Sequence, residues 1–396
     1  MTSLNFYQQV LAKLMQNPVV LDVETTTANK GNVHHLHNRL VTLQTKAGNT
    51  KPSVHFKDSF LDAKKQVLEA SCVIVFNGKF DLAWFKREFG TVPTCIWDCQ
   101  LAEFMFSNQT KIFHSLEATA QDYGIDGKLD IVKTEYWEKG IDTDEIPAEI
   151  LAEYGAQDVE ITWQVFLKQV ERFKEEQLSK FRLFRLHCND QLVLLEMEHN
   201  GIMYDCTASL SKADHVDAQI NNIIYKLNQF ADGIPINWSS RDHLSVFLYG
   251  GTIKTETRVP IGVYKTGAKT GQPRYKIIET AYDVARKIEP VKGSELAKEG
   301  YYSTDEPTLM SVKANKTMKT VIDWLLEKTG LEKLNGTYLR KLPKLIETNC
   351  WEPNMIFSTL NQCRVITGRL SSDKPNQQNF PKEAKQFCIS RYLCQS

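Results

Sequence analysis

The segment NPVVLDVETTT, residues 17–27, restricts the fold of this chain more than any other segment does. Its apolar and β-branched residues predict a strand. Side chains two residues apart on a strand point to the same face, so Asp22 and Glu24 lie side by side on an otherwise apolar surface. Such a pair is tolerated where the strand ends in solvent, or where a positive partner neutralises it.

A second segment, ASCVIVFNGKFDLAWFKREFG at residues 70–90, places another carboxylate close to the end of a strand. It predicts a buried strand over residues 72–76, a turn, and an amphipathic helix with Asn77 as its N-cap. Asp81 falls in the first turn of this helix, where a negative charge also favours the helix dipole. Asp81 alone therefore indicates no more than the start of a helix.

A third segment, EILAEYGAQDVEITWQVF at residues 149–166, predicts a helix with one buried stripe. The stripe contains Leu151, Tyr154, Asp158, Ile161 and Val165. An ionised carboxylate on a buried stripe is costly unless it is paired or bound to a metal ion. Asp158 is therefore a candidate metal ligand, and Tyr154 lies one turn before it on the same face.

Length and composition limit the number of domains, the binding partners and the cellular compartment that we expect for this chain. A chain of 396 residues predicts two or three domains, and its net charge of zero means that nucleic acid would have to bind to local basic patches. The nine cysteines form no C-x-x-C pair, which argues against a disulfide framework and favours a reducing cytoplasm. No apolar run approaches the roughly 18 residues that span a membrane, so we expect no membrane partner.

Together, the three segments resemble the DEDD exonuclease superfamily. They supply its D-x-E, N-x-x-x-D and Y-x-x-x-D motifs in order, and Glu153 stands where the histidine variant of the family has its histidine. The resemblance to the tyrosine variant implies an α/β fold of the RNase H type. It also implies two divalent cations, Mg²⁺ or Mn²⁺, and it gives each matched residue a role. The implied metal ligands are Asp22, Glu24, Asp81 and Asp158, with Tyr154 orienting the attacking water and Asn77 contacting the terminal nucleotide.

From residue 180 onwards, the sequence predicts long helices. Residues 181–205 form a helical stripe that ends at Asn200-Gly201, and residues 236–251 show a serine cap, a helix and a Gly-Gly stop. These segments resemble the start of the thumb of family-A DNA polymerases. Residues 264–276 predict an exposed loop or hairpin that is either simply solvated or grips the phosphates of duplex DNA. Its basic residues are Lys265, Lys269, Arg274 and Lys276.

The segment STLNQCRVITGRLSSDKPNQQNFP, residues 358–381, closely resembles the stretch that opens the palm of family-A polymerases. The matching motifs are T-G-R-L-S-S and P-N-x-Q-N-x-P. The resemblance implies that Arg369 reaches the minor groove near the primer terminus. It also implies that Gln378 and Asn379 belong to a polar loop near the duplex.

We therefore predict an RNase H-like exonuclease domain over residues 1–178, a helical thumb over 179–345 and the start of a palm over 346–396. The resemblance implies a 3′–5′ proofreading exonuclease that acts on single-stranded 3′ ends and primer-template DNA. Glu383 is the sole carboxylate after Pro381, so we expect the chain to stop before the polymerase aspartates and not to synthesise DNA alone.

Three alternatives remain open. They are a stand-alone exonuclease of the ribonuclease D type, a split polymerase that needs a second polypeptide, and a DNA clamp without catalysis. A separate cluster, His34, His35 and His37, is predicted to lie in a solvated loop rather than to bind metal.

Overall fold

The computed structural model describes residues 3–127, 131–176 and 178–391. Its contacts divide the chain into two compact units. The first unit joins Met1–Cys206 to Leu342–Ser396, and the second unit is Thr207–Lys341. The predicted division into three domains stays a prediction, because the two units group the chain by contacts and not by domain family.

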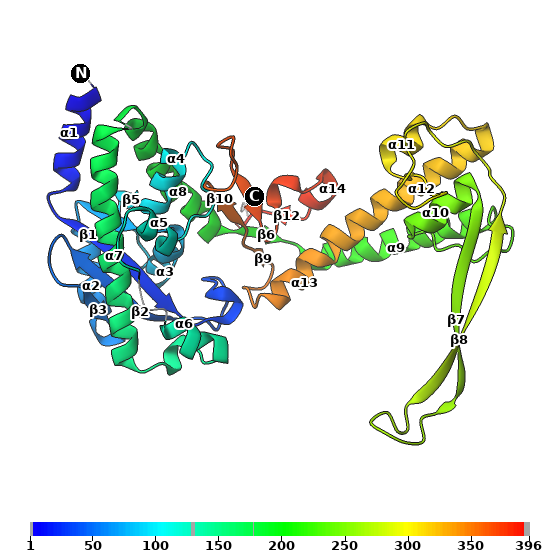
Figure 1. The fold of residues 1–396 in the computed structure, drawn as a ribbon, viewed down its shortest axis with the longest axis horizontal. Coiled ribbons are helices and arrows are strands. Elements are labelled where there is room, and N and C mark those ends of the chain that lie inside the picture. Colours follow the sequence, from blue (N-terminus) through cyan, green and yellow to red (C-terminus); the bar gives the residue numbers. More distant parts are fainter. Residues whose placement is uncertain (1–2, 128–130, 177, 392–396) are drawn as a thin grey trace, which may run out of the picture. The chain divides into compact units, whose positions relative to one another are not determined.

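A mixed five-stranded sheet forms the centre of the first unit (Figure 1). The strand order is β3-β2-β1-β4-β5, with β1 antiparallel to β2 and parallel to β4. This α/β sheet is the fold class that the sequence predicts. The strands are β1 (Pro18–Thr25), β2 (Leu40–Ala47), β3 (Ser53–His55), β4 (Cys72–Val75) and β5 (Ile96–Asp98).

Eight helices among the described residues of the first unit precede its second sheet. They are α1 (Ser3–Leu14), α2 (Phe60–Leu68), α3 (Lys79–Phe89), α4 (Cys99–Phe106), α5 (Leu116–Asp122), α6 (Ile131–Glu135), α7 (Ala148–Glu175) and α8 (Phe181–Asn200). The predicted stripe on α7 is confirmed, since all five of its members are buried. Trp97 joins α7 and α8 to the sheet, with ring centroids 5.0 Å from Phe166 and 4.7 Å from Phe184.

The C-terminal part of the first unit adds two small sheets. These contain β6 (Ile202–Tyr204), β9 (Met355–Ile356) and β12 (Cys388–Ile389) in one sheet, and β10 (Thr359–Asn361) and β11 (Ser371–Asp373) in the other, beside α13 (Lys341–Thr348) and α14 (Lys382–Lys385). The loop before β2 packs against this part. His34 stacks on Phe357 at 3.7 Å between ring centroids, and Leu36 N donates to Cys350 O at 2.9 Å.

This packing corrects one prediction about the histidine cluster. His35 is buried and His34 is half-buried, so a solvated loop is wrong for these two residues, although His37 is exposed. Burial also lowers the pKa of His34 to about 3, with the charges of His199 and Arg87 contributing. The sequence around the cluster could not predict this, because the covering residue, Phe357, lies far along the chain.

The second unit is helical with one long hairpin. Its elements are α9 (Cys206–Asn228), α10 (Arg241–Tyr249), β7 (Gly251–Val263), β8 (Pro273–Val284), α11 (Glu306–Ser311) and α12 (Lys316–Leu334), which a π turn at Asn335–Leu339 continues. The predicted cap is present, because the Ser240 side chain accepts from His243 N at 3.4 Å. The hairpin is longer than predicted, and almost all of its residues are exposed.

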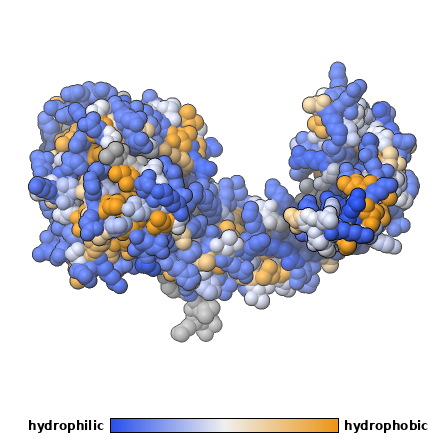
Figure 2. All heavy atoms as spheres, turned by 60° about the horizontal axis from the view of Figure 1, so that its bottom comes forward, coloured by the Kyte–Doolittle hydropathy of each residue, from blue (hydrophilic) through white to orange (hydrophobic). Residues whose placement is uncertain are grey.

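On the face shown in Figure 2, hydrophilic side chains cover most of the surface and hydrophobic ones form scattered patches. Among the helices that the structure describes, none combines the length and the apolar character that crossing a membrane requires.

Candidate active site

The register of β1 and β2 places both predicted carboxylates of β1 on the face that α7 covers. Asp22 pairs with Gln44 and Glu24 pairs with Thr42, and partners in an antiparallel register share a face. A Cβ atom added to Gly155 of α7 would lie 2.4 Å from Gln44 Nε2. A glycine at this position therefore allows α7 to lie close against the strands, one turn of helix before Asp158.

The structure brings three of the predicted ligands together. Asp22, Glu24 and Asp158 each offer a carboxylate oxygen, and these oxygens lie within 4.8 Å of one another. Among the residues described, no other group of histidine, cysteine or acidic side chains meets this criterion. Asp158 is buried with 7% of its surface exposed, and Asp22 is half-buried. Two segments that lie far apart in sequence thus form one acidic site.

Asp81 adds a fourth carboxylate to this site. It lies in the first turn of α3 and is 4% exposed. Burial raises the pKa of Asp81 well above its usual range, and the neighbouring charges of Asp22, Asp98 and Glu24 raise it further. Asp81 therefore interacts electrostatically with the two carboxylates of β1 that the sequence selected.

The turn before Asp81 differs from the prediction. Asn77 is not the N-cap of α3: Gly78 holds that position, no side chain caps the helix, and Asn77 has a left-handed φ of 58°. The backbone N–H groups of this turn donate instead to the side chain of Asp98, at the end of β5. Its Oδ2 accepts from Gly78 N at 2.8 Å, and its Oδ1 accepts from Asn77 N at 3.3 Å.

Asp98 is a positioning residue that the sequence analysis missed. It is 1% exposed, and it also caps α4 by accepting from Gln100 N and Leu101 N. Gln191 Nε2 donates to the same carboxylate at 2.5 Å. An Asp before a predicted helix would have indicated the cap on α4. No local pattern could have indicated the second role, in which Asp98 holds the turn that carries Asn77.

Tyr154 lies in a small apolar cluster beside the site. It is 8% exposed, and its ring meets Trp137 edge to face with centroids 5.9 Å apart. Val132, Ile146 and Leu151 belong to the same cluster. The ring is thus held on the stripe of α7 that also carries Asp158.

The donor set fits divalent cations. Carboxylate oxygens are the hard ligands that Mg²⁺ and Mn²⁺ prefer. Four partly or fully buried carboxylates also repel one another, and a cation would relieve both the repulsion and the cost of burial. The residues that could hold it are Asp22, Glu24, Asp81 and Asp158. The arrangement is therefore compatible with divalent metal binding, as the resemblance implied.

The other predicted binding residues lie on separate segments. Lys265 and Lys269 are exposed between β7 and β8, and Arg274 and Lys276 are exposed on β8. Their contact with nucleic acid stays a prediction.

In the palm segment, Arg369 and Asn379 are exposed. Gln378 holds its own loop together, because its Oε1 accepts from Ser372 N at 3.1 Å and its Nε2 donates to Leu370 O at 3.4 Å. The predicted contacts of Arg369, Gln378 and Asn379 with the duplex likewise stay predictions.

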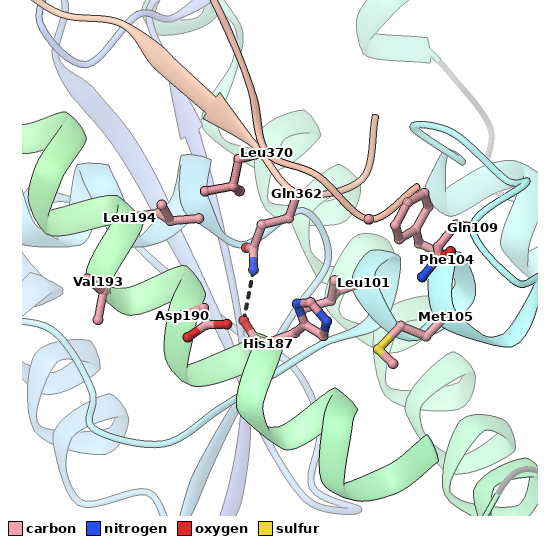
Figure 3. A pocket seen from close by; sticks show the side chains of 11 residues that line it. Leu101, Phe104, Met105, Gln109, His187, Asp190, Val193, Leu194, Gln362 and Leu370 are labelled. Carbon is pink, nitrogen blue, oxygen red and sulfur yellow. Dashed lines mark hydrogen bonds between the residues drawn. The ribbon is translucent and has the colours of Figure 1, made fainter. Parts of the chain in front are cut away.

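A cavity of about 280 Å³ lies between α4, α8 and the loop that follows β10 (Figure 3). Gln362 Nε2 donates to His187 O at 3.1 Å across it, and Gly368 lines it next to Arg369. None of the five predicted catalytic residues lines this cavity. It belongs to the packing between α8 and the palm segment and not to the carboxylate site.

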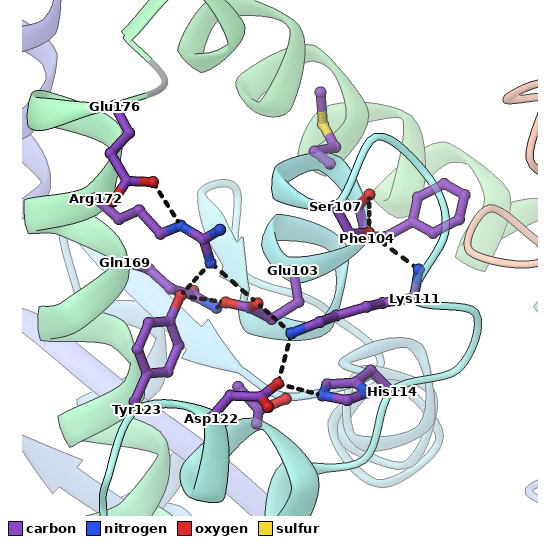
Figure 4. Close-up of polar contacts among 12 residues, drawn as sticks. Glu103, Phe104, Ser107, Lys111, His114, Asp122, Tyr123, Gln169, Arg172 and Glu176 are labelled. Atoms are coloured by element: carbon purple, nitrogen blue, oxygen red, sulfur yellow. Dashed lines mark hydrogen bonds and ion pairs between the residues drawn. The ribbon is translucent and has the colours of Figure 1, made fainter.

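A buried charged network fastens α7 to α4 and α5 (Figure 4). Glu103 of α4 is fully buried and accepts from Gln169 Nε2 at 2.9 Å and from Tyr123 OH at 2.5 Å. Arg172 Nη1 and Lys111 Nζ lie 3.6 and 3.7 Å from its other oxygen. Two cations and two neutral donors thus surround one carboxylate, and two of these partners come from the helix that carries Asp158.

Comparison with known proteins gives two family matches. Residues 2–171 match the family model described as 3′–5′ exonuclease, and residues 209–393 match the model described as DNA polymerase family A.

Curated relatives agree with these matches. The chain is 23% identical over 347 residues to the DNA polymerase of Bacillus phage SP01, an alignment that covers 81% of this chain and 35% of that protein. It is 27% identical over 319 residues to DNA polymerase I of Synechocystis sp., covering 78% of this chain and 27% of that protein. The chain thus spans about a third of the length of these relatives, or less.

A solved structure shows the same fold. The POL domain of Pol1 from M. smegmatis, in complex with DNA primer-template and dNTP, superposes with a TM-score of 0.61 at 16% identity. The match covers 95% of this chain and 55% of that chain. The α/β fold with a helical region is thereby confirmed.

Proposed function

We propose that this chain, which belongs to DNA polymerase family A and carries a 3′–5′ exonuclease domain of that family, removes nucleotides from the 3′ ends of DNA by metal-dependent hydrolysis. The observation that carries the proposal is the cluster of Asp22, Glu24 and Asp158, whose carboxylate oxygens lie within 4.8 Å of one another. Asp81 completes the set from α3. The substrates and activities of the longer relatives are assigned to this chain only as part of this proposal.

Each residue of the site has a proposed role. The four carboxylates hold two divalent cations, which when bound supply the positive charge and Lewis acidity that phosphodiester hydrolysis needs. Tyr154 orients the attacking water from the apolar cluster that fixes its ring. Asn77 contacts the terminal nucleotide, in a turn that Asp98 holds through Asn77 N and Gly78 N. The enzyme thus places its nucleotide contact and its ligand Asp81 on one short segment.

A labelled oligonucleotide tests the proposal. We expect residues 1–396 to shorten a 5′-labelled single strand progressively from its 3′ end in Mg²⁺ or Mn²⁺, and to stop when a chelator is added. Absence of a ladder, or a ladder that the chelator leaves unchanged, contradicts the proposal. An RNA strand of the same sequence separates the two enzyme alternatives, because an enzyme of the ribonuclease D type would degrade RNA faster than DNA.

Replacing Tyr154 by phenylalanine tests the role of its hydroxyl. The ring stays in its apolar cluster, so the fold should be unchanged, whereas a lost positioning contact should slow hydrolysis by about 10²-fold. Single-turnover rates at saturating metal measure the effect. Tyr136→Phe, in the neighbouring half-buried position, is the matched control and should keep the normal rate. An equal rate for both variants would show that the Tyr154 hydroxyl has no part in catalysis.

The match of residues 209–393 to the polymerase family supports binding of duplex DNA. We assign part of this binding to the basic hairpin. Residues 258–276 contain five basic residues and no acidic one, and the four basic residues singled out above are all exposed. The logarithm of the DNA affinity falls with the logarithm of the salt concentration, and each phosphate contact that is lost makes this slope less steep by about 0.9. Replacing the four by alanine should therefore weaken primer-template binding and flatten its salt dependence.

A charge-matched variant controls for net charge. Replacing four exposed lysines of the first unit by alanine removes the same charge from residues outside the hairpin; they are Lys51, Lys57, Lys65 and Lys174. Equal losses of affinity in the two variants would mean that the hairpin does not contact DNA. A second polypeptide that takes part in synthesis stays a prediction.

A further inference from the structure

Two thiols face each other where β4 and β5 begin. Val73 pairs with Ile96 in parallel register, and Val73 N donates to Cys95 O at 2.9 Å, so Cys72 and Cys95 stand opposite one another. Neighbouring strands lie about 4.8 Å apart, which falls within the Cα separation that a disulfide can span. Residues that stand opposite one another on paired strands point to the same side of the sheet, so the two thiols are neighbours there.

Arg185 of α8 adds a positive charge to this pair. Its Nη2 lies 3.2 Å from Cys95 Sγ, and its Nη1 donates to Ile96 O, which holds the guanidinium in place. The neighbouring Cys72 thiol and the charge of Arg185 lower the pKa of Cys95 to about 6. A lowered pKa increases the share of Cys95 in the thiolate form, which is the form that attacks electrophiles.

The two thiols differ in access. Cys95 is partly exposed, whereas Cys72 has no exposed surface. The Cys72 pKa is raised well above its usual range, first by the neighbouring Cys95 thiol and then by burial. A solvent-borne reagent can thus reach Cys95 and not Cys72, but a group formed on Cys95 lies within reach of Cys72.

We propose that Cys95 and Cys72 form an oxidisable dithiol, in which Cys95 reacts with a hydroperoxide and Cys72 resolves the product to a disulfide. In the first step, the Cys95 sulfur attacks the peroxide oxygen, the O–O bond breaks, and sulfenic acid forms with release of hydroxide or alkoxide. In the second step, the Cys72 sulfur attacks the sulfenic sulfur, and the Cys72 proton leaves with the sulfenic oxygen as water. The protein loses two electrons in total, which the hydroperoxide accepts.

Cys188 is the rival resolving residue. It is fully buried on α8 and close enough to Arg185 for the two groups to influence each other's pKa. Strand pairing favours Cys72, because the next residue, Val73, is hydrogen-bonded to the backbone of Cys95. The dithiol contains none of the proposed metal ligands, and its chemistry does not depend on the exonuclease proposal.

The experiment treats reduced residues 1–396 with hydrogen peroxide, blocks the remaining thiols with an alkylating reagent and maps the peptides by mass. We expect a Cys72–Cys95 disulfide to form before any other cysteine is oxidised. A disulfide between Cys95 and Cys188, or oxidation of other cysteines with Cys95 still reduced, overturns the proposal. This peptide mapping uses the unaltered chain, so its result does not depend on whether a variant folds.

Variants test the assigned roles. Cys72→Ser should leave a sulfenic acid on Cys95 that a dimedone reagent traps, whereas Cys95→Ser should form no disulfide at Cys72. Arg185→Gln removes the charge next to the thiolate and should slow oxidation by about tenfold at pH 7. Cys350→Ser, at a half-buried cysteine elsewhere in the first unit, is the matched control and should react like the unaltered chain. An unchanged rate in Arg185→Gln overturns the role of the guanidinium.

Discussion

Replacing Asp22 and Glu24 together by alanine will lower the rate of 3′-terminal hydrolysis by at least about 10³-fold, because losing metal-held charge at the reacting phosphate costs several kcal/mol of the barrier. The two residues share the face of β1 that α7 covers, and they contribute two of the three carboxylates in the cluster. The measurement is the decay of a 5′-labelled oligonucleotide in Mg²⁺, with single-turnover rates for both proteins.

The same double variant should remain folded. Removing two mutually repelling carboxylates relieves electrostatic strain, so the thermal midpoint should stay the same or rise. Asp58→Ala with Asp62→Ala removes an exposed acidic pair and should keep full activity. Normal hydrolysis by the Asp22 and Glu24 variant would place the chemistry outside this cluster. An unfolded variant would show instead that the carboxylates are structural.

Replacing Glu103 by leucine will destabilise the packing of α7 by about 3 kcal/mol, because removing one member of a buried charged network leaves its partners unsatisfied. Gln169 is fully buried and would lose an acceptor for its amide, as would the Tyr123 hydroxyl. Arg172 and Lys111 are about a third exposed and can turn to solvent, which limits the penalty.

Hydrogen exchange measures this loss locally, which suits a chain with two compact units because a single unfolding free energy is not defined for it. The amides of α4 and α7 should exchange faster in Glu103→Leu. Glu103→Gln keeps the shape and an acceptor, so it should cost less. Glu117→Leu changes an exposed glutamate on α5 and should leave the exchange rates unchanged. Equal exchange in Glu103→Leu and the unaltered chain would mean that the network adds nothing to stability.

The strand and the helix that carry the candidate site are predictable from the sequence alone. The alternation around Asp22 and Glu24, and the stripe that includes Tyr154 and Asp158, are local periodicities that a strand and a helix each express alone. Both elements appear where the sequence predicts them. Periodicity could not show that these separate segments contribute to one site. That inference came from the resemblance of their motifs to a known family. Gly155, next to Tyr154, is also consistent with this arrangement, because α7 approaches β2 closely at that position.

The residues that support that site are identified by the tertiary contacts and not by the sequence. Asp98 holds the Asn77 turn from 20 residues along the chain, and Glu103 reaches Gln169 from 66 residues away. His34 becomes half-buried where Phe357 stacks on it, and Arg185 places a positive charge beside Cys95. None of these pairs has a local spacing, because each partner comes from a different element. Their contacts depend on how the sheet, the helices and the palm segment pack, and a period of two or 3.6 residues carries no information about that packing.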